Sequence, residues 1–184
     1  LRGMRRGCVS LAVGEGFVSD LIKNALPSFK TTYPEITFTL RSGSTEAVVQ
    51  DIHNDAAHLG FVFNAKPDRQ SKVLVHMAQP LRLLAAPTSD WAKTATPVSI
   101  SSLAAMPSAV LSSGSGIGAM VREVETIYGV RLNRALEANS LAAIRNFVRE
   151  GLGVTVLPAF VVAQEIADGT IVDLPLDVSE FSRG

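Results

Sequence analysis

The sequence contains one cysteine, carries no net charge and has no long apolar run, and each of these shortages excludes a class of protein. A lone cysteine, Cys8, cannot form an internal disulfide, so the chain fits a reducing compartment. The 17 basic and 17 acidic residues cancel, which argues against a nucleic-acid surface, because such a surface needs clustered lysine and arginine. No apolar run approaches the roughly 20 residues of a membrane span. Cys8 lies in a predicted strand and is expected to be a packed core thiol rather than a nucleophile.

Motifs for catalysis, cofactors and metals are also missing. The G-x-G-x-x-S run that begins at Gly14 falls short of a dinucleotide fingerprint, and Gly114-Ser115-Gly116 fails the nucleophile-elbow pattern by one position. The three histidines have no partners at metal-ligand or triad spacing; they are His53, His58 and His76. We therefore predict no catalytic residue, no metal site and no cofactor, and we do not expect an enzyme.

The composition itself predicts a folded α/β protein. Apolar residues make up 47% of the chain and charged residues 18%, which is enough for a core. Alternation over Gly7–Val13 predicts a strand, and the apolar spacing of Phe17–Lys30 predicts a helix that follows it. A second strand is expected at 36–40, a helix from Thr45 to about Ala57, and a buried strand at 59–63. The first 64 residues thus read as βαβαβ.

The same pattern starts again after residue 80. Apolar runs at 73–78 and 81–86 predict one strand that leaves the first unit and one that begins a second. The expected later elements are helices 99–106, about 116–128, about 140–150 and 158–167, strands 108–111, 133–137, 154–157 and 171–176, and a polar tail 177–184. Gly129 is expected to end the helix before it. Two successive α/β units follow from this order.

Two units of this kind suggest a cleft with a hinge. If the last strand returns to the first sheet, residues 7–78 and 169–184 form the first subdomain and 79–168 the second, with 1–6 as the end of a linker. Pockets favour positions between domains, and domains often close around ligands.

Polar helix N-termini follow four predicted strands. They are Glu15-Gly16, Ser42–Thr45, Ser112–Ser115 and Asn139-Ser140. Free N–H groups and the helix dipole can bind small polar or anionic ligands there. For any one of them, a serine that merely caps its helix is the simpler interpretation. The set of four, two in each unit, favours a binding protein.

Several of these motifs together resemble the effector-binding domain of LysR-type transcriptional regulators. The motifs are Gly7–Gly14 with its helix, Leu26–Phe29, Tyr33–Ile36, Ser42–Thr45, Ala57–Val62, Leu81–Ala85, Asn139-Ser140 and Gly151–Pro158. The last run, GLGVTVLP, is the most specific. The resemblance covers nearly the whole chain.

This resemblance implies two Rossmann-like subdomains joined by two crossover strands, with a fold like that of type 2 periplasmic binding proteins. It also implies a cytoplasmic regulator that senses a small-molecule effector and binds DNA through an N-terminal winged helix-turn-helix that this sequence does not contain. A homodimer is expected, with a tetramer as the alternative for the full-length protein. The opening LRGMRRG resembles the join after the linker helix, so the chain is expected to be a fragment.

The family's effector contacts correspond here to ten residues: Glu15, Gly16, Ser44, Thr45, Phe63, Asn64, Leu84, Ser115, Pro158 and Phe160. Glu15 departs from the small or hydroxyl residues common at its position, and Asn64 stands where some relatives have a basic residue. Both changes favour a ligand with an amine or several hydroxyls over a simple carboxylate. Two alternatives stay open: a periplasmic solute-binding protein of an uptake system, and an enzyme of the same two-lobed fold.

Overall fold

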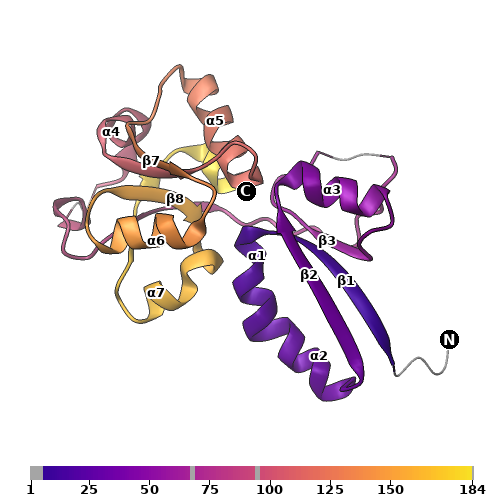
Figure 1. The fold of residues 1–184 in the computed structure, drawn as a ribbon. Coiled ribbons are helices and arrows are strands. Elements are labelled where there is room, and N and C mark those ends of the chain that lie inside the picture. The colour runs from indigo at the N-terminus through magenta and orange to yellow at the C-terminus, as the bar shows by residue number, and fades with distance from the viewer. Residues whose placement is uncertain (1–5, 67–68, 94–95, 184) are drawn as a thin grey trace. The chain divides into compact units, whose positions relative to one another are not determined.

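The computed structural model describes residues 6–66, 69–93 and 96–183, and Figure 1 shows their fold. The chain divides into two compact units, Leu1–Leu74 and Val75–Gly184. Each unit has its own sheet and its own helices. The prediction of two successive α/β units is confirmed, whereas the predicted linker, residues 1–6, lies almost wholly outside the described residues.

The first unit is a three-stranded parallel sheet with helices on both faces (Figure 1). The sheet order is β2-β1-β3, with β1 at Gly7–Gly14, β2 at Ile36–Gly43 and β3 at Leu59–Phe61. One face packs on a helical segment made of α1 (Glu15–Asp20), a π-helical turn (Leu21–Ala25) and α2 (Leu26–Thr32). The other face packs on α3 (Thr45–His53). The predicted helices and the first three strands of this unit are confirmed, except that α3 ends at His53 rather than near Ala57 and β3 ends at Phe61 rather than at residue 63.

Successive residues of β1 separate into two core clusters, as strand geometry requires. Leu11 and Val13 pack with Leu21, whereas Ala12 packs with Val48 on the opposite face. The expectation that Cys8 is a core thiol is wrong, because Cys8 is exposed. Ala12, four residues further along the same strand, is 0% exposed and packs with Val48 of α3.

The second unit is built on a five-stranded mixed sheet of order β7-β6-β8-β4-β9. Strands β6 (Ser108–Leu111), β7 (Arg134–Ala138) and β8 (Val154–Pro158) are parallel, and β4 (Leu81–Ala85) runs antiparallel to β8 and to β9 (Val172–Leu174). The α-helices are α4 (Ile100–Ala105), α5 (Gly116–Tyr128), α6 (Leu141–Arg149) and α7 (Ala163–Ala167). A small parallel pair joins β5 (Val98–Ser99) to β10 (Leu176–Asp177). Short 3₁₀ turns lie at Asp90–Lys93, Ala159–Val162 and Ser179–Arg183.

The predicted return of the last strand to the first sheet is wrong. In the structure β9 pairs with β4, and β10 pairs with β5, so both strands belong to the second unit. The tail is not simply polar either: Val178 is 3% and Phe181 2% exposed, and both side chains belong to the core. Residues 169–183 are held there because their apolar side chains find buried positions beside β4.

The predicted strand at 73–78 is also absent from the described structure. Residues 73–79 have no strand or helix, and Val73, Leu74, Val75 and Met77 are between 64% and 75% exposed. The apolar composition alone favoured a strand, but a strand also needs a neighbour to which its N–H and C=O groups can bond. The next run, Leu81–Ala85, has two such neighbours and forms β4.

Candidate functional site

Three polar turns meet at the carboxyl edge of the first unit's sheet. The strands are parallel and in register there: Gly14 lies opposite Gly43, and Val13 lies opposite Phe61. The residues that follow these positions therefore come to one edge, where open parallel sheets bind ligands. They are Glu15 and Gly16 after β1, Ser44 and Thr45 after β2, and Phe63 and Asn64 after β3. Six of the ten predicted contact residues are thus brought to one edge of one unit.

The turn after β2 opens a helix of nine residues, α3. Ser44 is its N-cap, and the Ser44 Oγ accepts a hydrogen bond of 3.2 Å from the Ala47 N–H. Thr45 is the first residue of the helix and is half-buried. One N–H of the first turn is satisfied by the cap, and the helix dipole adds positive potential at this end. This end of α3 can stabilise a negative or electron-rich ligand group.

The turn after β3 has an unusual backbone. Asn64 has a φ of +52°, in the left-handed region that non-glycine residues seldom adopt. Its side chain is exposed, and the neighbouring Phe63 is half-buried. Asparagine tolerates this conformation better than most residues, and such strain is concentrated at functional sites. The conformation places an amide, both donor and acceptor, at the same edge as Thr45 and Glu15.

The four predicted contacts of the second unit are arranged less uniformly. Ser115 follows β6 and caps α5, with its Oγ accepting a 2.9 Å hydrogen bond from the Gly118 N–H. Pro158 ends β8 opposite Leu81, and Phe160 follows in a 3₁₀ turn, half-buried. Leu84 lies inside β4, opposite Thr155 and Asp173, and is 0% exposed. Pro158 is thus the last residue of a strand, Ser115 and Phe160 follow strands, and Leu84 is fully buried.

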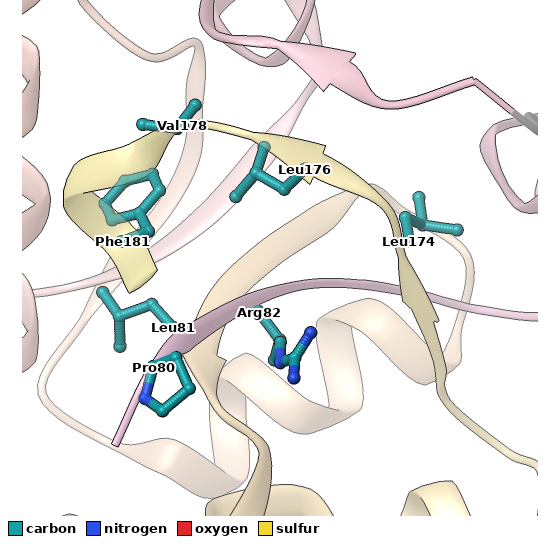
Figure 2. Close-up of a pocket in the computed structure, with 7 residues that line it drawn as sticks. All are labelled: Pro80, Leu81, Arg82, Leu174, Leu176, Val178 and Phe181. Atoms are coloured by element: carbon teal, nitrogen blue, oxygen red, sulfur yellow. The ribbon is translucent and has the colours of Figure 1, made fainter. Parts of the chain in front are cut away.

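Sequence reasoning did not single out a pocket in the second unit. It is lined by Pro80, Leu81, Arg82, Leu174, Leu176, Val178 and Phe181, as Figure 2 shows. The one signal in the sequence is Arg82, a charged residue inside the apolar run LRLLA. Pro80 and Leu81 adjoin Arg82, but the four lining residues from Leu174 to Phe181 could not be grouped with them in advance, because they lie far along the chain.

His53 and His58 take part in hydrogen bonds of the described structure, and His76 is exposed. The Ser10 N–H donates a hydrogen bond of 2.9 Å to the His58 Nδ1, and the His58 N–H donates one of 2.8 Å to the Ser10 carbonyl. His53 Nε2 lies 3.1 Å from the Ser71 Oγ. Within residues 6–66, 69–93 and 96–183, no three His, Cys, Asp or Glu side chains are grouped so that they could hold a metal ion. None of the described helices has the length and apolar character that crossing a membrane would require.

Comparison with known proteins identifies the family. The model of the LysR substrate binding domain matches residues 2–184, so the chain belongs to the LysR substrate-binding domain family. This confirms the resemblance drawn from the sequence motifs.

The relatives are transcriptional regulators. The chain is 27% identical over 184 residues to the transcriptional activator CmpR of Synechocystis, and it covers 58% of that protein while 98% of the chain is matched. Among solved structures, the regulatory domain of Synechocystis CcmR in complex with 2-PG has a TM-score of 0.78 at 23% identity, covering 94% of this chain and 82% of that one. The effector binding domain of QuiR in complex with shikimate has a TM-score of 0.76 at 15% identity, covering 94% and 81%.

These likenesses confirm the predicted fold class, the α/β fold of type 2 periplasmic binding proteins. They also favour a regulator over the uptake-system alternative. The chain spans about three fifths of the curated relatives that it matches, 60% of the Escherichia coli regulator YeiE and 58% of CmpR.

Proposed function

We propose that this domain is the sensor of a LysR-type regulator and that it binds a small polar metabolite at the carboxyl edge of the first unit's sheet. The observation that carries the proposal is the convergence of three polar turns there, at Glu15-Gly16, Ser44-Thr45 and Phe63-Asn64. Ser115, Pro158 and Phe160 are proposed as the contacts from the second unit. Two points stay predictions from the sequence: that one effector contacts both units, and that Leu84 is one of its contacts.

The rest of the regulator is proposed from the relatives. A metabolite would act by binding one conformation of the domain better than another, because a ligand can shift an equilibrium only by its differential affinity. DNA would be bound by a winged helix-turn-helix outside this chain, in the cytoplasm. The domain itself would bind without catalysis. Turnover of a bound ligand would contradict this last point.

The chemistry of the edge favours a ligand with hydroxyl or amino groups. Glu15 is exposed and carries a negative charge, which opposes a simple carboxylate. Asn64 and Thr45 supply neutral donors and acceptors, which suit hydroxyls. QuiR was solved with shikimate and CcmR with 2-PG, so both of these compounds belong in the screen beside amines and polyols.

Thermal shift with such a panel tests the proposal. A compound bound only by the folded chain at about 100 times its Kd adds roughly 2.7 kcal/mol of stability. With the compound that gives the largest shift, T45V is expected to raise the Kd about tenfold, because the loss of one hydroxyl contact is worth about 1.4 kcal/mol.

The matched control is T126V, which removes a threonine hydroxyl from the exposed face of α5. That hydroxyl donates a hydrogen bond of 2.9 Å to the Arg122 carbonyl and lies in no proposed contact. T126V is expected to bind as the wild type does. If T45V and an E15Q variant both keep wild-type affinity for the compound, the proposed edge is not the site.

A homodimer is part of the proposal, and the first helical segment would form its interface. Ile22 is 53% and Phe29 38% exposed on this segment, more apolar surface than a helix that only covers a sheet requires. We expect I22E to weaken the dimer at least tenfold in sedimentation velocity, because a charge would be buried in an apolar contact. V73E, which changes another exposed apolar residue, should leave the dimer unchanged. A dimer equally tight in I22E would exclude this helix from the interface.

A further inference from the structure

Residues 72–80 connect the two units and are the longest stretch without helix, strand, turn or bend in the part of the chain that the structure describes. The boundary between the units falls inside this connection, between Leu74 and Val75. Within the described structure, residues 72–79 belong to no sheet and make no backbone hydrogen bond. The backbone is therefore extended here, and its N–H and C=O groups are free to bond to a partner.

The side chains of this connection are apolar and exposed. Val73, Leu74, Val75 and Met77 are 68%, 64%, 75% and 69% exposed. No other large apolar side chain of the described structure is more than 58% exposed. Residues 72–78 are all exposed, so seven consecutive residues are accessible together with their unpaired backbone.

Such a segment has the form in which an endoprotease binds its substrate. A protease needs several consecutive residues that are accessible and free of backbone pairing, and cleavage therefore concentrates in segments of this kind. The aliphatic side chains indicate the class of enzyme, one with an apolar pocket beside the bond that it cleaves. We propose that residues 72–78 are a cleavage site for an endoprotease of this class, and that one cut there separates the two units.

The reaction is the hydrolysis of one peptide bond between residues 72 and 77. One water adds across the C–N bond, which leaves a carboxylate at the new end of one fragment and an ammonium group at the start of the other. Each unit has its own sheet, so both fragments are expected to stay folded. The cut would also disconnect the effector edge of the first unit from the contacts proposed on the second. This consequence alone rests on the proposed function.

Limited digestion of the 184-residue chain with thermolysin, which cleaves before large aliphatic residues, tests the site. The fragments are assigned by mass spectrometry, and the first cut among the described residues is expected within residues 72–77. Ile22 and Ile127 are 53% and 58% exposed, but they lie in helical segments. The bonds before these two residues should be cut at least tenfold more slowly, because their backbone must first unfold locally.

Trypsin provides a second test, because it binds the same backbone through a different side chain. It is expected to cut after Lys72 at least tenfold faster than after Lys23, which is exposed but helical. K72Q should abolish this tryptic cut and leave the thermolysin cut unchanged, whereas the matched control K23Q should change neither. Circular dichroism before digestion reports the folding of both variants.

Two results would overturn the inference: first cuts by both enzymes inside the helices or strands of a unit, or thermolysin cuts before Ile22 and Ile127 as fast as those within residues 72–77. Resistance of residues 72–77 that disappears on dilution would also contradict it, and would assign the segment to pairing with a second copy of this chain. The proposed effector site can fail without changing these expectations, because fragment masses report only cleavage.

Discussion

Alanine at Gly153 is expected to lower the free energy of unfolding by about 3 kcal/mol, the upper end of the roughly 1–3 kcal/mol that an added carbon in a packed interior typically costs. A Cβ built there would lie 2.1 Å from the Pro107 carbonyl oxygen and 2.8 Å from a ring carbon of Phe147. The carbonyl cannot move freely, because it accepts a hydrogen bond of 2.9 Å from the Val154 N–H. The backbone just before β8 must therefore shift, and with it the pairing of β8 with β6.

Two other glycines provide graded controls for this effect. Gly129 has a φ of +64° and no atom within 4 Å of its built Cβ, so G129A carries backbone strain alone, about 1–2 kcal/mol. A Cβ built at Gly7 has no atom within 4 Å, and Gly7 has no positive φ. The free energy of unfolding of G7A should therefore stay within about 0.5 kcal/mol of the wild-type value. Urea unfolding measures all three. If G153A is as stable as G7A, the close approach of Gly153 to Pro107 has no energetic weight.

The second large effect is expected at the buried ion pair of the second unit, which joins α5 to β7. Glu125 is 8% exposed and accepts hydrogen bonds from Arg134 with both carboxylate oxygens, one of them 2.8 Å long from the Nη1. Its Oε1 also accepts a hydrogen bond of 2.7 Å from the Leu132 N–H. E125Q is expected to cost about 3 kcal/mol, because the removal of one partner leaves Arg134 largely buried without its main counter-charge.

A second carboxylate near Arg134, that of Glu137, keeps the expected cost of E125Q at about 3 kcal/mol, the lower end of the roughly 3–5 kcal/mol typical for a broken buried ion pair. Glu137 Oε2 lies 3.4 Å from the Arg134 Nε, and that nitrogen has no hydrogen bond in the described structure. E123Q, two positions away on the exposed side of the same helix, is the matched control and should be neutral. If E125Q is as stable as E123Q, the attraction between Glu125 and Arg134 only offsets the cost of removing both charges from water, and the pair adds no net stability.

The same pair predicts how stability depends on pH. Burial by itself would raise the pKa of Glu125, but the hydrogen bonds from Arg134 and Leu132 outweigh it and hold the pKa below the ordinary value of 4.5. A carboxyl with a lowered folded pKa contributes stability above its unfolded pKa and loses it as the pH falls through the folded pKa. The stability difference between wild type and E125Q should therefore be constant near neutral pH and shrink below about pH 4.5.

Local sequence patterns predicted most of the elements and several of their ends. The spacing of apolar residues predicted α5, and Gly129 ends it in the left-handed conformation that a C-terminal glycine allows. Ser44, Ser115 and Ser140 each cap the helix that the sequence assigned to them. These features depend on residues within one or two turns of each other, so a short window contains their cause.

Three polar turns of the candidate site were also predictable, because parallel strands bring their carboxyl ends to one edge. Once 7–13, 36–40 and 59–63 were predicted as successive strands of βαβ units, Glu15, Thr45 and Asn64 had to lie near that edge. The left-handed backbone of Asn64 was not predictable, since neither an asparagine nor its neighbours require it.

By itself, then, the sequence determined the class of the fold, its two units, the family and the edge of the first sheet where polar turns gather. Only the tertiary structure decided that β9 and β10 pair within the second unit, that Cys8 is exposed, and that the start of β4 and the segment from Leu174 to Phe181 line one pocket. The physical reason is the same in each case. These outcomes depend on which distant segment supplies a strand neighbour or a covering side chain, and periodicity along one segment contains no information about that partner.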